Sequence, residues 1–167
     1  MRVTTTALIV FSTFAINIAS AELKTIAPPE ICTYMKTFDL ATQGWKVLGG
    51  NIFACGSQMK NLGESSSLTE NPNNITFFVQ GDNTVANKAE LILNVNNRGT
   101  AETAHNELLK ASEILTLKAT GVELPKGLKD AIKTGKKANA KIGSFSVEVD
   151  RDTWPTGKGY EVKVTIK

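Results

Sequence analysis

Residues 144–167 read SFSVEVDRDTWPTGKGYEVKVTIK, and this stretch decides the fold class. Apolar side chains alternate with polar ones in both halves of it, at Phe145, Val147 and Val149 and again at Tyr160, Val162, Val164 and Ile166. Such alternation is typical of a strand with one buried face. Residues 152–159 contain two glycines and a proline, which suit a turn. The sequence therefore predicts an antiparallel hairpin at this end of the chain.

The remaining chain divides into strand and helix patterns. Strands are predicted at residues 45–48, 51–55, 75–80 and 89–96, and apolar spacings of three and four predict helices at residues 30–42, 100–118 and 126–137. Half-buried antiparallel strands with helices on one face define an α+β fold. We expect one domain, residues 22–167, with an antiparallel sheet of about six strands packed against two or three helices, in the order α-β-β-β-β-α-α-β-β.

Residues 1–21 have the pattern of an export signal. Arg2 supplies a positive charge, residues 7–18 are mostly apolar, and residues 19–21 give the small-x-small pattern that signal peptidases cut. The apolar run is shorter than the ~20 residues of a transmembrane helix. We expect a mature chain that begins at Glu22, has no transmembrane segment and is periplasmic or otherwise secreted.

The two cysteines, Cys32 and Cys55, are predicted to form a disulfide, because an even number of cysteines in an exported protein is typical of paired thiols. The 22 residues between them exclude a CxxC redox motif. A tetrahedral zinc site would have only His105 beside the two thiols. We expect the disulfide to join the first helix to an early strand, and we expect no metal or other cofactor.

A lysine-rich segment follows the second predicted helix. The whole chain has 19 basic and 16 acidic residues, but residues 106–167 hold twelve basic and eight acidic ones. Helical spacing would gather six ammonium groups on one face, the predicted lysine face: Lys126, Lys129, Lys133, Lys136, Lys137 and Lys141. Such a face fits an acidic protein or an anionic component of the cell envelope, or is a solvated helix surface without a partner. Nucleic acid is not expected, because the segment has neither aromatic residues nor arginines to contact bases.

No residue pattern indicates catalysis. His105 is the single histidine, is expected to be partly exposed on its helix, and has no G-x-S-x-G nucleophile motif to act with. Glu148, Asp150 and Asp152 alternate on one strand face about 7 Å apart, a spacing found in glycosidases. We interpret them as surface charges instead, with lysines of the neighbouring strand opposite them.

The predicted contact regions are the polar loop at residues 63–74, the turn at 152–159 with Trp154, and the lysine face. Trp154 is either a contact residue for a partner or a cover for the end of the sheet. We expect a non-catalytic binding protein, such as an inhibitor, immunity or accessory factor. The alternative is a carrier of small ligands or lipid headgroups, and a hydrolase comes third. Asn74-Ile75-Thr76 also matches the N-glycosylation pattern, which matters only in a eukaryotic host.

Overall fold

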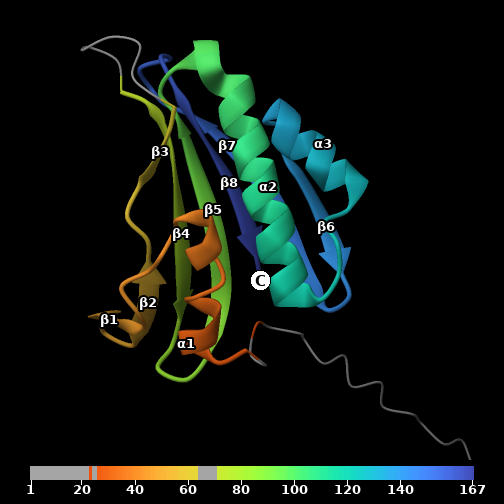
Figure 1. Ribbon diagram of the computed structural model, residues 1–167. Helices are drawn as coiled ribbons and strands as arrows, with labels where there is room; N and C mark the ends of the chain where they lie inside the picture. The colour runs from red at the N-terminus through yellow and green to blue at the C-terminus, as the bar shows by residue number, and fades with distance from the viewer. Residues whose placement is uncertain (1–22, 24–25, 64–70) are drawn as a thin grey trace, which may run out of the picture.

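The computed structural model describes residues 23, 26–63 and 71–167, which form a sheet layer and a helix layer (Figure 1). The helices of these residues are α1 Pro28–Ile31, α2 Ala101–Thr120 and α3 Lys126–Thr134, with two 3₁₀ turns, η2 Lys36–Phe38 and η3 Arg98–Thr100. The strands are β1 Lys46–Gly49, β2 Ile52–Gly56, β3 Lys60–Leu62, β4 Asn73–Gly81, β5 Ala86–Val95, β6 Ala138–Ile142, β7 Phe145–Thr153 and β8 Tyr160–Ile166. The predicted α+β class is confirmed.

The eight strands form one antiparallel sheet in the order β1-β2-β4-β5-β8-β7-β6, with β3 also paired to β4. The predicted C-terminal hairpin is confirmed as β7 and β8, in register from Val147 opposite Ile166 to Thr153 opposite Tyr160. Strand β8 also pairs with β5, so the last strand of the chain lies inside the sheet. This position explains its strong alternation, because every second side chain of β8 faces the core.

The sheet has two more strands than the predicted six, namely β3 and β6. Strand β3 has three residues and no apolar alternation, whereas β6 directs Ala138, Ala140 and Ile142 toward the core. Alanine contributes little to a hydrophobic pattern, so no strand was predicted for residues 138–142, which follow the predicted helix at residues 126–137. Both strands are edge additions that leave the predicted fold class unchanged.

The first helix is much shorter than the predicted residues 30–42. Helix α1 ends at Ile31 and is followed by turns and η2. The Thr33 hydroxyl donates to the Glu30 carbonyl oxygen at 2.7 Å, a local bond that competes with helical hydrogen bonding. Asp39 then takes a left-handed conformation with φ of 60°, which ends η2.

Helix α2 covers the middle of the sheet with the predicted stripe of small and apolar residues (Figure 1). Ala104, Leu108, Ala111 and Leu115 are all buried and contact the apolar face of the sheet. Their small size allows the helix to approach the strands closely. Thr100 stands at the N-cap without capping through its side chain; its hydroxyl accepts a hydrogen bond from Asn73 Nδ2 at 3.0 Å instead.

The opposite face of the sheet has no helix of the described residues over it, and we call it the open face (Figure 1). Polar side chains of the inner and C-terminal strands project from it, because the alternate positions face the core. Charged groups there are paired with each other, as in Lys88 with Glu90 at 3.1 Å and Lys167 with Glu148 at 2.8 Å. Over much of its area, this surface therefore consists of solvated side chains whose charges form ion pairs with each other.

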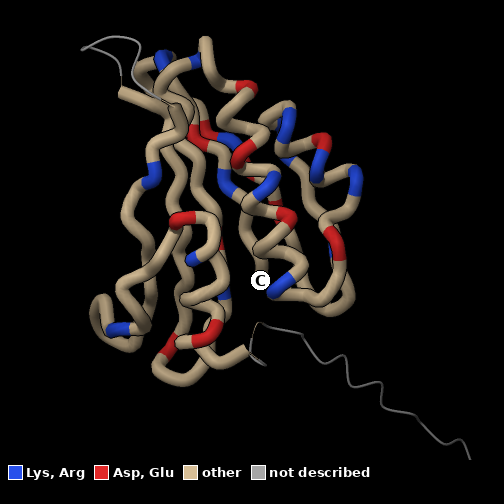
Figure 2. Tube along the Cα trace, in the orientation of Figure 1, with Lys and Arg blue, Asp and Glu red and all other residues tan. Residues whose placement is uncertain are grey.

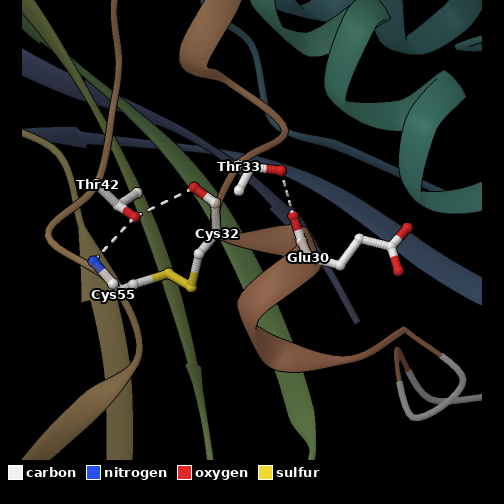
Figure 3. Close-up of a disulfide and its surroundings, with 6 residues drawn as sticks. Glu30, Cys32, Thr33, Thr42 and Cys55 are labelled. Carbon is white, nitrogen blue, oxygen red and sulfur yellow. Dashed lines mark hydrogen bonds between the residues drawn. A yellow bond between two sulfur atoms is a disulfide. The ribbon is translucent and has the colours of Figure 1, made fainter.

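The predicted disulfide between Cys32 and Cys55 is confirmed (Figure 3). It joins the end of α1 to β2, with a Cα–Cα distance of 6.0 Å. The Thr42 hydroxyl donates to the Cys32 carbonyl oxygen at 3.1 Å and holds the returning chain beside the bond (Figure 3). The bond therefore connects the helix layer to the sheet.

The predicted leader, residues 1–21, lies outside the described residues, as do residues 64–70 of the predicted 63–74 loop. Among the residues that are described, no helix is long and apolar enough to cross a bilayer.

Candidate functional site

Trp154 occupies the turn between β7 and β8 at the end of the sheet where β4 begins and β5 ends (Figure 1, top). The turn is closed by two backbone hydrogen bonds, from Trp154 N–H to Gly159 O at 3.2 Å and from Gly157 N–H to Trp154 O at 2.8 Å. A Cβ at position 159 would collide with the indole ring and come within 2.5 Å of the Val95 carbonyl oxygen. Glycine at 159 therefore leaves room for the partly buried indole ring beside the end of β5.

Two surface hollows meet at Trp154. The first, of about 540 Å³, defines what we call the asparagine groove and is lined by Met59, Asn61, Asn71, Pro72, Asn74, Asn94, Asn96 and Trp154. The second, of about 760 Å³, is lined by Asn71, Asn96, Asn97, Arg98, Gly99, Trp154, Thr156, Gly157 and Lys158. Trp154, Asn71 and Asn96 belong to both, so the ring stands between two adjoining depressions.

Three strands supply a row of amides to the asparagine groove. Asn61 on β3 is opposite Asn74 on β4, and Asn74 is opposite Asn94 on β5. Since Ile75 and Leu93, the next residues on these strands, are fully buried in the core, Asn74 and Asn94 project from the open face. Asn94 Nδ2 donates to Asn74 Oδ1 at 2.9 Å, which links the two side-chain amides.

A second set of hydrogen bonds holds the surrounding loops in place. Asn73 is buried, and its amide group donates to Asn97 O at 3.0 Å and accepts from Asn97 N–H at 2.8 Å. Asn96 Nδ2 donates to Pro72 O at 2.7 Å. Because these bonds join the start of β4 to the segment after β5, the groove has a rigid floor.

The other hollow has a basic rim. One Arg98 guanidinium nitrogen donates to Gly157 O at 2.8 Å, which ties η3 to the Trp154 turn. The same guanidinium lies 6.0 Å from the centroid of the Tyr160 ring, a cation–π distance. Arg98 thus supports the turn, while Lys158 is exposed beside it.

His105 was expected to be partly exposed, and this prediction is wrong, because only 3% of the residue is accessible. Its Nδ1 is 2.5 Å from Ile132 O and its Nε2 is 2.9 Å from the Tyr160 hydroxyl, so a neutral ring satisfies both contacts by donating to the carbonyl and accepting from the phenol. The Arg151 guanidinium stacks 3.7 Å from the Tyr160 ring centroid. Both ring nitrogens are therefore used to join α2 to α3 and β8.

The predicted lysine face is not a single surface. Helix α3 ends at Thr134, so its lysines are Lys126, Lys129 and Lys133, whereas Lys136 and Lys137 follow the helix and Lys141 lies in β6. Lys141 alternates with core-facing Ala140 and Ile142 and therefore projects from the open face, away from α3. The structure thus divides the six lysines between two sides of the molecule.

Figure 2 shows acidic positions among the basic ones on α2 and α3, and several of these lysines have acidic partners. Lys126 bonds Asp130 at 2.5 Å, Lys129 bonds Glu113 at 2.6 Å, and Lys137 lies 3.1 Å from Asp150. The hydrogen bond from Lys126 lowers the pKa of the Asp130 carboxyl, and the bond to Glu113 raises the pKa of Lys129. An anionic partner for the lysines remains a prediction.

The three carboxylates of β7, Glu148, Asp150 and Asp152, lie at the surface beside residues of β8. Glu148 bonds Lys167 at 2.8 Å, and Asp150 is opposite Lys163 in the register of β7 and β8. Asp152 is opposite Glu161, which bonds Lys163 at 3.1 Å. Within the described part of the chain, no group of three or more histidine, cysteine or acidic residues could hold a metal ion.

Sequence reasoning identified Trp154 but missed the asparagines. Asn74 was expected at the end of a loop, whereas it lies inside β4 and is partly buried. Asn94 lies within the strand predicted at residues 89–96, and no role was predicted for it. Their proximity depends on strand register, which connects residues 20 positions apart and is not visible in either segment alone.

No protein-family model, no curated protein and no solved structure matches the chain. The fold class and the geometry of the groove are therefore the basis for a functional proposal.

Proposed function

We propose that the protein is an exported, non-catalytic binding protein and that the asparagine groove is its contact surface. The observation that carries this proposal is the meeting of two adjoining hollows at Trp154, with several amides converging on the same place. Concave surfaces with an aromatic side chain and a few convergent polar groups are the usual form of binding sites. A partly exposed tryptophan also provides contact area at small entropic cost, because its ring has few rotatable bonds.

The packing of the core favours an external contact surface over the alternative of a carrier with an internal cavity. Large side chains from both layers, such as Met35, Phe77 and Leu108, are fully buried between the sheet and the helices. The two hollows at Trp154 both lie at the surface, at the end of the sheet. A partner that covers this end would contact strands and turns at the same time.

Export is supported by the leader pattern of residues 1–21 together with the disulfide. It is tested on protein recovered from the envelope or the medium by N-terminal sequencing and by alkylation without reductant. We expect the chain to begin at Glu22 and neither cysteine to be alkylated. Recovery of the protein only from the cytosol, with both thiols reactive, would contradict export.

The contact surface is tested by photo-crosslinking in the producing cell. A benzophenone amino acid replaces Asn71, which is exposed at the rim of both hollows, and in separate variants replaces Asn139 or Lys126. Asn139 is the matched control, because it is an exposed asparagine of the open face on the distant edge strand β6. We expect an adduct from position 71 and none from 139. An adduct from position 126 alone would show that the contact surface lies on α3 and would contradict the proposal.

A further inference from the structure

The lining of the asparagine groove contains no charged side chain. Its eight residues are five asparagines, a methionine, a proline and a tryptophan. A ligand with strong charges would find no counter-ion there, and its desolvation would be costly. The row continues beyond the groove with Glu161 opposite Asn94 and with Asp152 opposite Glu161, so its continuation is acidic. The groove is therefore suited to a neutral, polar ligand and unsuited to a polyanion.

The amides of the row match hydroxyl groups that both donate and accept hydrogen bonds. A side-chain amide carries an oxygen with two lone pairs and a nitrogen with two hydrogens. Asn94 uses one hydrogen toward Asn74, and its oxygen has no hydrogen bond from another described residue. The side-chain amides of Asn61 and Asn71 likewise have no bonds within the described parts of the chain. Neighbouring strands place such amides roughly 5 Å apart, a spacing comparable to the width of one sugar ring.

Trp154 supplies the apolar component of the groove. The indole is kept in place by the closed turn and by close contact with Gly159, so little conformational freedom is lost when a ligand covers it. A flat aromatic ring packs well against the C–H face of a pyranose, whose hydroxyls then point sideways toward the amides. Met59, which is 65% exposed, provides a second and more adaptable apolar contact in the same lining.

From these three features we infer that the asparagine groove binds a neutral carbohydrate chain, an inference that rests on the proposed function. A peptide fits less well, because peptides that join a sheet pair with the backbone of an edge strand. Here β4 and β5 are inner strands with strands paired on both sides and offer side chains of one face, and β3, the edge strand of the groove, has only three residues with which a peptide could pair. The two adjoining hollows also give room for more than one sugar ring along the path past Trp154.

The inference is tested with the purified disulfide-bonded protein on an array of neutral oligosaccharides and in gels containing dextran, laminarin or galactomannan. Affinities for a responding oligosaccharide are then measured by titration calorimetry. The variants are Trp154→Ala, Asn94→Ala and Asn71→Ala, with Asn139→Ala as the matched control on the same sheet face. Asn71 is exposed, so its replacement leaves the fold intact even if removal of Trp154 does not.

We expect binding that Trp154→Ala weakens at least about tenfold, because the stacking surface is removed. Asn94→Ala and Asn71→Ala each weaken it by about 3- to 10-fold, for the loss of one or two hydrogen bonds, whereas Asn139→Ala changes it less than about twofold. The affinity is unchanged between about 50 mM and about 0.5 M NaCl, because no ion pair contributes.

Three results would overturn the inference. The first is the absence of binding to any neutral glycan. The second is binding that Asn139→Ala weakens as much as Asn71→Ala and Asn94→Ala do. The third is binding that falls steeply with salt, which indicates a polyanion. If position 71 crosslinks to a protein while no glycan binds, the proposed function stands and the carbohydrate inference fails. If position 71 gives no adduct of any kind and no glycan binds, both fail.

Discussion

Removal of the Cys32–Cys55 disulfide gives a stability change that can be worked out from the structure. The bond closes a loop with a sequence separation of 23 that contains η2, β1 and most of β2. The loop-entropy relation for a closed loop of this length gives about 3 kcal/mol of stabilisation, because the unfolded chain loses conformational freedom. This is a large part of the ~5–15 kcal/mol by which a domain of this size is stable.

The folded state keeps other contacts across the loop. Ile31, Met35 and Leu40 are fully buried, and Lys60 Nζ donates to Phe38 O at 2.9 Å. Because these contacts do not depend on the bond, the Cys32→Ala/Cys55→Ala variant should still fold, with its free energy of unfolding lowered by about 3 kcal/mol.

The assay is equilibrium unfolding in urea, followed by fluorescence of the two tryptophans. Trp45 lies inside the disulfide loop and stacks on Phe53 with ring centroids 6.5 Å apart, whereas Trp154 lies outside it. Variants that retain only one tryptophan, with phenylalanine at the other position, report on each region separately. We expect both reporters to give the same lower midpoint, and reductant to shift the wild type but not the double variant.

Two results would refute this reasoning. A loss below about 1 kcal/mol would show that the closed loop does not restrict the unfolded chain as assumed. A transition at Trp45 well before the one at Trp154 would show that α1, η2 and β1 detach as a separate unit, so that the bond fixes a local segment instead of the whole fold.

Four further outcomes are expected. Tyr160→Phe should cost about 1–3 kcal/mol in urea unfolding, because His105 Nε2 is left buried without a partner, and an unchanged midpoint would contradict the bond. Gly135→Ala should cost about 2–4 kcal/mol, since residue 135 has φ of 60° and its Cβ would lie 2.6 Å from His105 Cε1; a cost below about 1 kcal/mol would disprove this steric account. Burial, reinforced by the Glu30 carboxylate and its hydrogen bond, raises the pKa of Tyr34 from 10.0 to about 12. The free energy of unfolding should therefore fall as pH rises from about 10 to about 12, because the unfolded chain loses the phenol proton first. The Tyr34→Phe variant should lack that part of the pH dependence. Lys126→Ala should change the free energy of unfolding by less than about 0.5 kcal/mol, because its ion pair is exposed, and a larger loss would show a structural role for this lysine.

The parts of the fold that follow from local pattern were predictable. The hairpin of β7 and β8 has strict alternation, and helix α2 has a continuous stripe that includes Ala104, Leu108 and Leu115. In both elements the local preference and the tertiary environment agree. The disulfide was predictable from the expected export and the even cysteine count, without any knowledge of the distance between the two chain segments.

The parts that depend on distant contacts were not predictable from spacing alone. His105 has the sequence surroundings of a helix surface, and its burial depends on Tyr160, 55 positions later, and on the carbonyl of Ile132. The lysine segment was expected to be one helix face, but Gly135 ends α3 in a left-handed conformation and the chain then enters β6. Local periodicity contains no information about such pairings.

The arrangement of the asparagine row has a consequence for how the protein can change over time. Asn74 and Asn94 alternate with Ile75 and Leu93, which are fixed in the core. Displacement of β4 by one residue would turn the amides inward and expose the apolar side chains, so core packing forbids it. The scaffold thus protects the layout of the groove, whereas each outward side chain is free to be exchanged. The surface chemistry of the groove can therefore change one residue at a time in descendants of this protein while the architecture stays the same.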